Sequence, residues 1–210
     1  MKIQTIQYSI YTLIAVVIVV TAVAYFVAVP KTQPTPPQAQ VPVESTIPEG
    51  WKQYDSLTYN FAIQYPTDYT IKEDHTYTAL GPGKDISGVA FIVSESITKG
   101  TNLSTDSYMS VERTNANDCL AQNFLDQVKQ SETVTENGVV YTMAIGNGAG
   151  AGNRYDETVY ATKVNDSCYG LRLFVHYSVL ENYDPGTVVD FNHTLLNDNF
   201  KQFRSSFVAK

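Results

Sequence analysis

Stretches in which apolar and polar residues alternate recur between residues 59 and 177. Because successive side chains of a strand point to opposite faces, this alternation predicts strands with one buried face. Turn signals such as Gly81-Pro82-Gly83 and Asn137-Gly138 separate the stretches, which is typical of hairpins. We therefore expect an antiparallel β-sheet of about six or seven strands. The predicted strands are 59–65, 76–80, 88–94, 139–145, 158–164 and 169–177.

Two other segments have apolar residues at the spacing of a helix face. In 118–129 they occupy positions i, i+4, i+5 and i+8, and in 190–207 they follow one stripe. Asp190 is placed to cap the second helix at its N-terminus. Helices among hairpin strands predict an α+β fold, in which the sheet packs against two main helices. The apolar positions are Leu120, Phe124, Leu125, Val128, Phe191, Leu195, Leu196, Phe200, Phe203 and Phe207.

A different pattern fills residues 10–29, which carry no charge. A helix of this length spans the roughly 30 Å hydrocarbon core of a bilayer, where every backbone amide must bond within the segment. We expect one transmembrane helix at 10–29, preceded by a short cytoplasmic N-terminus at 1–9. The alternative is a cleaved signal peptide, with Lys2 as its basic start and Ala22-Val23-Ala24 as its cleavage site. The apolar run continues past that site to Val29, which favours an uncleaved signal anchor.

The next segment, 30–50, is a proline-rich linker. Between 30 and 48 it holds six of the nine prolines of the chain. Proline fixes φ and favours an extended spacer, so the linker is expected to hold the following domain away from the membrane. Pro34 and Pro37 also have the spacing of a ligand for an SH3-like partner, although a stalk explains the composition without one. Residues 51–210 have the size of one domain with its own core.

Charge is unevenly distributed along the chain. The segment 44–210 holds all 21 acidic residues and 12 of the 14 basic ones, which gives it a net charge of −9. A nucleic-acid partner would need clustered Lys and Arg to displace counterions from phosphates, so this class of partner is excluded. The 15 Tyr and 9 Phe, with abundant Val and Ile, favour a folded domain over a disordered one.

The sequence contains two cysteines, Cys119 and Cys168, both within 51–210. In an exported protein they are expected to form a disulfide, which requires an oxidising compartment. This supports a single-pass orientation with the N-terminus inside the cell and the C-terminal domain outside it. Two buried free thiols are one alternative. A redox or metal pair is another, but there is no C-x-x-C and no His at ligand spacing beside either cysteine.

The two ends of the domain resemble a known family. Residues 61–69 read Phe-Ala-Ile-Gln-Tyr-Pro-Thr-Asp-Tyr, which looks like the strand and turn that open PsbP-type domains. Residues 200–207, which end Phe-Arg-Ser-Ser-Phe, resemble the closing helix of those domains. The resemblance implies a PsbP-like α+β sandwich and the role of an extracytoplasmic accessory or assembly subunit, usually without catalysis. The middle of the domain, 146–161 and 182–191, is similar instead to uncharacterised exported bacterial proteins.

A glycine-rich run, Gly146-x-Gly148-x-Gly150-x-Gly152, is the nearest approach to a cofactor motif. A phosphate loop must follow a strand and open a helix, whereas an alternating strand follows this run. We therefore expect a flexible hairpin. The histidines match no metal or triad motif, and carboxylate pairs such as Asp156-Glu157 are expected on the solvated surface. Weak calcium binding through Asp184 and Asp190 is a minor alternative. We assign no catalytic, cofactor or metal residue.

Tyrosine and arginine are favoured at interaction hot spots, so Arg154, Tyr155, Arg172 and Tyr183 form a candidate interaction surface. The leading hypothesis is a membrane-anchored prokaryotic cell-envelope protein with a noncatalytic extracytoplasmic binding or scaffolding domain. Its partner would be another envelope protein. The alternatives are an envelope hydrolase whose site assembles only in space, and a small-ligand or carbohydrate-binding module. A deep pocket that holds a histidine beside a serine or a carboxylate would favour the hydrolase.

Overall fold

The computed structural model describes residues 47–115 and 117–210. They belong to a compact unit that extends over Ser45–Lys210. The expected N-terminal segment 1–9, the transmembrane helix 10–29 and most of the linker 30–50 lie outside the described residues. Within the described part of the chain, every helix is too short or too polar to cross a bilayer.

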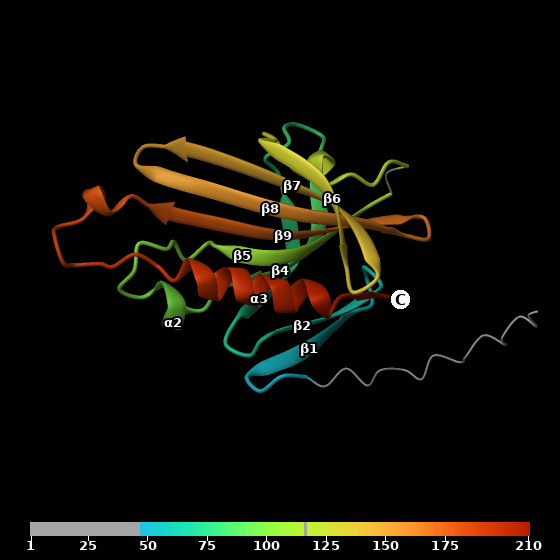
Figure 1. The fold of residues 1–210 in the computed structure, drawn as a ribbon, viewed down its shortest axis with the longest axis horizontal. Helices are drawn as coiled ribbons and strands as arrows, with labels where there is room; N and C mark the ends of the chain where they lie inside the picture. Colours follow the sequence, from blue (N-terminus) through green and yellow to red (C-terminus); the bar gives the residue numbers. More distant parts are fainter. Residues whose placement is uncertain (1–46, 116) are drawn as a thin grey trace, which may run out of the picture. The chain divides into compact units, whose positions relative to one another are not determined.

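Seven antiparallel strands form the main sheet (Figure 1). Their order is β3-β4-β5-β9-β8-β7-β6, so β9 lies between β5 and β8. Sequence neighbours form the hairpins, whereas the β5–β9 pairing joins distant parts of the chain. The predicted antiparallel α+β architecture is confirmed. The strands are β3 (Thr70–Tyr77), β4 (Ile86–Ile92), β5 (Tyr108–Thr114), β6 (Gln130–Glu136), β7 (Val139–Gly150), β8 (Asn153–Val164) and β9 (Ser167–Ser178).

A smaller sheet and one long helix accompany the main sheet. The small sheet has the order β1-β2-β10 and pairs both ends of the described chain with β2. In Figure 1, α3 lies along the strands between this small sheet and the main one. The remaining elements are β1 (Trp51–Ser56), β2 (Phe61–Pro66), β10 (Val208–Ala209), α2 (Glu95–Thr98), α3 (His193–Ser205) and the 3-10 turns η1 (Ala121–Phe124) and η2 (Leu180–Asn182).

Helix α3 closes the main hydrophobic core. Its spacing buries Leu196, Phe200 and Phe203 along one side. Phe203 packs edge-on against Phe91 of β4, with ring centres 5.2 Å apart, and Phe200 packs edge-on against Tyr160 of β8 at 6.0 Å. Because burying a side chain of this size stabilises a fold by about 1.5 to 3 kcal/mol, this row fixes α3 to one face of the main sheet.

On the opposite face of the main sheet, a smaller core forms around η1. The disulfide between Cys119 and Cys168 was predicted from the sequence. It joins the chain just before η1 to β9, with Cα atoms 5.3 Å apart. The Phe124 ring lies directly over Gly170, where a Cβ would approach the ring to 2.5 Å. Glycine is therefore required at this position for Phe124 to close over the sheet.

The prediction of a helix at 118–129 is wrong. This segment forms only the turn Ala121–Phe124, and Leu125 is already extended. The carbonyl oxygen of Phe124 accepts a hydrogen bond from Arg172 Nη2 at 2.6 Å, where a helix would give it the amide of Val128. The amide of Lys129 donates to a β7 carbonyl at 2.8 Å. Hydrogen bonds to the sheet thus override the helical apolar spacing.

Other boundaries also differ from the predictions. The C-terminal helix forms within 190–207, but its N-cap is Asn192 and not Asp190, because Asn192 Oδ1 accepts from the Leu195 amide at 3.0 Å. Strands β1, β5, β6 and β10 were not predicted. In β5 the first five residues are all buried, Ser110 and Glu112 among them, so the strand lacks the alternation of a half-exposed strand.

The glycine-rich segment forms the hairpin between β7 and β8, as predicted. The chain turns at Ala151 and Gly152, which have φ values of 50° and 79°. Gly146, Gly148 and Gly150 lie before the turn and belong to strand β7 itself. Three of the four glycines therefore lie within a strand, and only Gly152 forms part of the turn.

Candidate functional site

Strand β9 determines which side chains meet on each face of the main sheet. Leu171 and Leu173 belong to the core that α3 closes. Since strand side chains alternate between faces, Arg172, Phe174 and His176 point to the opposite face. The open side of the sheet thus receives one cation and two rings from the middle of an apolar strand.

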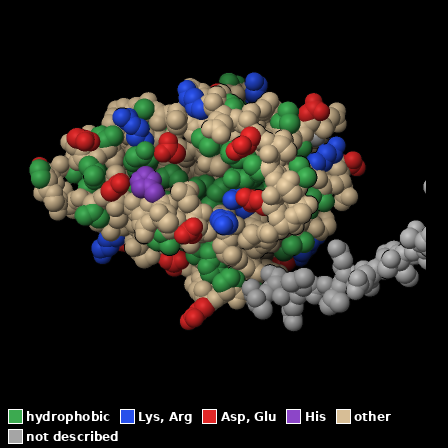
Figure 2. All heavy atoms as spheres, in the orientation of Figure 1, with side chains coloured by type: hydrophobic (Ala, Val, Ile, Leu, Met, Phe, Trp, Pro, Cys, Tyr) green, Lys and Arg blue, Asp and Glu red, His purple; other side chains and the backbone are tan. Residues whose placement is uncertain are grey.

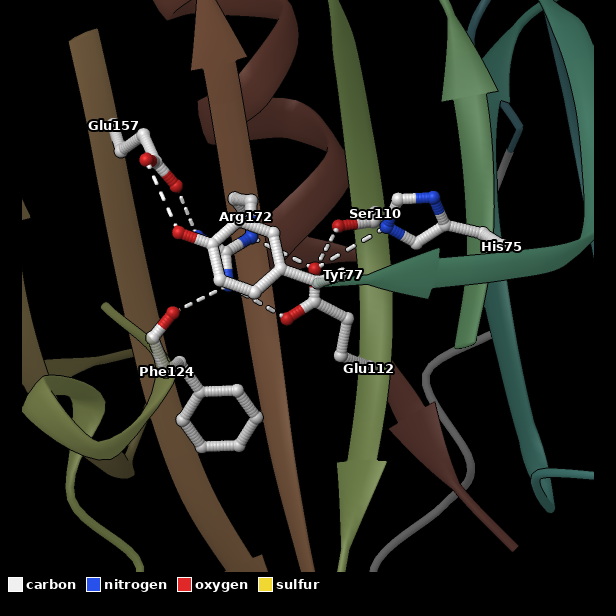
Figure 3. Close-up of polar contacts among 7 residues, drawn as sticks. All are labelled: His75, Tyr77, Ser110, Glu112, Phe124, Glu157 and Arg172. Atoms are coloured by element: carbon white, nitrogen blue, oxygen red, sulfur yellow. Dashed lines mark hydrogen bonds and ion pairs between the residues drawn. The ribbon is translucent and has the colours of Figure 1, made fainter. Parts of the chain in front are cut away.

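Arg172 is fully buried at the centre of a charged cluster (Figure 3). Its guanidinium donates two hydrogen bonds to Glu112, from Nε at 2.7 Å and from Nη2 at 2.8 Å. Nη1 donates to Glu157, and Nη2 also reaches the Phe124 carbonyl. The guanidinium carbon lies 3.5 Å from the ring centre of Tyr77, within the range of a cation–π contact. Every side of the guanidinium is therefore occupied by protein.

Further contacts complete the cluster. Ser110 Oγ donates to Glu112 Oε1 at 2.8 Å, and His75 Nε2 lies 3.5 Å from the same oxygen. The hydroxyl of Tyr77 donates to Glu157 at 3.2 Å. Figure 3 shows these side chains converging from β3, β5, β8 and β9, with α3 behind the strands. The cluster therefore joins four strands of the main sheet.

Burial and ion pairing set the pKa values in the cluster. Burial alone would raise the pKa of Glu112, but the charge and hydrogen bonds of Arg172, with the Ser110 hydrogen bond and the nearby His75, lower it to about 2. The pKa of Glu157 is raised, mainly by burial, and Arg172 offsets only part of this effect. Burial raises the pKa of Tyr77 to about 12. Glu112 thus carries the charge that balances Arg172.

Three adjoining hollows open beside the cluster, and we call them together the groove. The first, of about 370 Å³, is lined by His75, Tyr77 and Phe174 among others. The second, of about 120 Å³, shares Tyr77 with the first and reaches Glu157. The third, of about 740 Å³, shares Tyr155 with the second. Because Tyr77 and Glu157 belong to the cluster, the buried charges support the wall of the groove.

A row of aromatic rings follows the groove. Tyr108 stacks on Phe174 with ring centres 5.0 Å apart, and Phe174 lies 6.3 Å from Tyr155. Tyr155 stacks on His176 at 4.5 Å, and His75 lies 4.8 Å from Tyr108. Phe174, Tyr155 and His176 are only partly buried. Cross-strand register produces the row, because Tyr108 pairs with Phe174 and Tyr155 pairs with His176.

Two histidines lie beside carboxylates, His75 beside Glu112 and His176 beside Asp106. The distance from His176 Nδ1 to Asp106 Oδ1 is 2.8 Å. Such a pair can orient a general base toward a nucleophile. Within the described residues, however, His176 Nε2 is buried without a hydrogen-bond partner. Asp106 therefore occupies the place of the orienting carboxylate in a catalytic triad. The hydroxyl or thiol that a triad would place beside His176 Nε2 is missing among the described residues.

Charges of both signs occur around the groove. Lys72 and Asp106 line the first hollow, Asp126 lines the second, and Lys129 and Arg154 line the third. Figure 2 views the molecule from the opposite side, on which α3 lies, and shows acidic and basic side chains interspersed there as well. In the part of the chain that the structure describes, no group of three or more His, Cys, Asp or Glu could hold a metal ion. The calcium alternative gains no support from the geometry.

The structure separates the four residues of the candidate interaction surface. Arg154 and Tyr155 line the third hollow together. Arg172 was assigned to the surface wrongly, because it has no exposed area and its donors bind Glu112 and Glu157. Tyr183 follows the turn η2 and does not line the described hollows. The pair 156–157 is also not wholly solvated, since Glu157 is mostly buried in the cluster.

Several residues of the site were missed from the sequence. Tyr77, Tyr108, Glu112 and Phe174 lie on three strands and meet only through the strand order. One signal was available, since Arg172 interrupts an otherwise apolar alternating strand, and a buried arginine needs an acidic partner. The position of that partner, 60 residues away, was not visible in the sequence.

The fold and the groove define an α+β protein that has a helix on one face of an antiparallel sheet and an aromatic groove on the other. No family model and no curated protein matches the chain. Among solved structures, it is similar to cyanobacterial PsbP from Synechocystis sp. PCC 6803, with 14% identity, a TM-score of 0.45 and coverage of 77% of this chain and 93% of that one. PsbP is the family that the ends of the domain resemble.

A crystal structure from Bacteroides thetaiotaomicron VPI-5482 is also similar, with 12% identity and a TM-score of 0.45. The match covers 76% of this chain and about half, 48%, of that one.

Proposed function

We propose that this chain is a membrane-anchored cell-envelope protein with a noncatalytic binding domain outside the membrane, and that the groove is the binding site. The observation that carries the proposal is the aromatic row along the groove. Partly exposed rings provide a large contact area at low cost in side-chain entropy, which suits them to binding sites. Polar side chains beside the rings can then fix the orientation of a ligand.

The location outside the membrane is supported by two features. Residues 10–29 are uncharged and have the length of one membrane span. The disulfide between Cys119 and Cys168 requires an oxidising compartment. N-terminal sequencing of the membrane-bound protein tests the anchor, because a chain that begins at Tyr25 would show cleavage after Ala24.

Site-specific crosslinking in intact cells tests the binding function. A photo-crosslinking phenylalanine analogue at Gln127, which lines the groove, is expected to capture one specific envelope component. The same analogue at Leu57, which is 86% exposed and does not line the described hollows, is the matched control. The capture at Gln127 should be lost when Phe174→Ala removes a ring from the row. Equal capture from both positions, or none from Gln127, would contradict the proposal.

A hydrolase is the second candidate, and the His176–Asp106 pair is the observation that favours it. A histidine held by a carboxylate can act as a general base, and here the buried Nε2 must first become exposed before it can take a proton from water. If the groove hydrolyses its ligand, His176→Asn abolishes turnover while binding persists. If the domain only binds its ligand, neither the wild type nor His176→Asn shows turnover.

A further inference from the structure

At Gly148, strand β7 leaves the wall of the groove without a side chain. Gly146 pairs with Glu157 and Gly148 with Tyr155, so these glycines share the open face with those residues. A Cβ at Gly148 would lie 3.8 Å from the Tyr155 side chain. Any larger residue at Gly148 would therefore cover Tyr155, and glycine leaves one side of that ring accessible.

Polar side chains with unused hydrogen-bonding capacity surround this ring. Asp126 and Gln127 line the second hollow and are exposed. Neither side chain makes a hydrogen bond to another described residue. Amides both donate and accept, and a carboxylate accepts. Lys129 and Arg154 add donors in the third hollow. These side chains together offer both donors and acceptors, which suits a ligand whose own groups both donate and accept hydrogen bonds.

We propose that the groove binds an uncharged oligosaccharide, with one sugar ring stacked on Tyr155 and its hydroxyls bonded to Asp126 and Gln127. This inference rests on the groove being a binding site, as proposed above. The C–H groups on one side of a pyranose ring carry slight positive charge and pack on the negative face of an aromatic ring. Sugar hydroxyls are both donors and acceptors, which matches the mixed polar set.

Other ligand classes fit the groove less well. A polyanion would need clustered basic side chains. Lys129 and Arg154 instead share the groove with Asp126 and Asp156, in a domain of net charge −9. An extended peptide gains most of its affinity by hydrogen bonding along a strand edge. The aromatic row instead crosses the strands, because Tyr108, Phe174 and Tyr155 belong to three different ones.

Titration with defined sugars tests the inference. The full-length chain, in a detergent without a sugar head group, is titrated calorimetrically with maltohexaose, cellohexaose and chitohexaose. We expect saturable binding of at least one of them. Gly148→Leu should weaken this binding by about tenfold or more, which corresponds to about 1.4 kcal/mol, because the leucine covers Tyr155.

Gly150→Leu is the matched control, since Gly150 lies in the same strand and a Cβ there meets no atom within 4 Å. It should bind the sugar like the wild type. Tyr155→Ala provides a second loss-of-binding variant should Gly148→Leu lower the melting temperature. Equal sugar binding by the wild type and Tyr155→Ala overturns the inference.

The two proposals fail in distinguishable ways. If none of the sugars binds but Gln127 still crosslinks to one envelope protein, the oligosaccharide is wrong and the binding function stands. If neither sugar nor crosslinked component is found, both proposals are wrong.

Discussion

At the scale of single residues, the buried Arg172 dictates its surroundings. A guanidinium removed from water must have its charge balanced and its donors satisfied inside the protein, since an unpaired buried charge costs several kcal/mol. Glu112 provides the balancing charge through two hydrogen bonds, and Glu157 and the Phe124 carbonyl take further donors. Tyr77 covers the remaining face. The cluster holds the strands that carry the aromatic row.

Substitution of Glu112 tests this role. Glu112→Gln is expected to lower the free energy of unfolding by about 3 to 5 kcal/mol at pH 7, because it leaves Arg172 without its main counter-charge. The pKa of Glu112 is lowered from 4.5 to about 2 on folding, so its contribution is complete above pH 4.5 and disappears as the pH falls toward 2. The deficit of the variant, measured by urea unfolding at several pH values, should therefore shrink in that range.

Glu157→Gln is the matched control for this prediction. Burial raises the pKa of Glu157, so folding disfavours its charged form. Loss of that charge should therefore lower the free energy of unfolding by less than the loss at Glu112. A Glu157 variant as destabilised as the Glu112 variant, or a deficit independent of pH, would contradict the assignment of charge within the cluster.

At the scale of elements, the segment 118–129 shows how tertiary contacts replace a local preference. The turn η1 offers the Phe124 carbonyl to Arg172 and its ring to Gly170. A continuous helix would use that carbonyl internally and leave a guanidinium donor unpaired in the core. The turn is thus part of the charged cluster as well as the cover of one end of the open face.

Gly170→Ala tests the close contact beneath this turn. The new Cβ would lie 2.5 Å from the Phe124 ring, so the turn must shift away from the sheet. We expect a loss of about 1 to 3 kcal/mol in the free energy of unfolding, as for other overpacked sites. Thermal unfolding compared with Gly150→Ala, which adds the same methyl where no atom lies within 4 Å, measures the effect. Equal melting temperatures for the two variants would rule out the contact.

At the scale of the whole described unit, the two faces of the main sheet have different roles. Helix α3 and a large apolar core close one face, and this side accounts for most of the buried apolar side chains. The other face has a small core around η1 and leaves the aromatic row partly exposed. The disulfide fastens that small core to β9. This division places stability on one face and the candidate site on the other.

Removal of the disulfide is expected to affect the smaller core first. Replacing Cys119 and Cys168 together by Ser should cost about 2 to 4 kcal/mol, because the bridge closes a loop with a sequence separation of 49. Denaturant unfolding of the double variant measures this loss. A thiol assay on unfolded, unreduced protein should find no free thiol, and a count of two would show that the bridge does not form.

The sequence by itself determined the local features of this protein. Alternation located the long hairpin strands, the 190–207 stripe located α3, and the two cysteines identified the bridge. These signals succeed because each depends on neighbouring residues or on a pair with no competing partner.

Only the tertiary structure decided the strand order, the burial of Arg172 and the fate of 118–129. Alternation tells which side chains share a face and does not tell which strands become neighbours. Placing β9 between β5 and β8 brings Glu112 and Glu157 to the same guanidinium and aligns the aromatic rings. Long-range pairing therefore created both the charged cluster and the groove, because their residues are distant in sequence and adjacent only across strands.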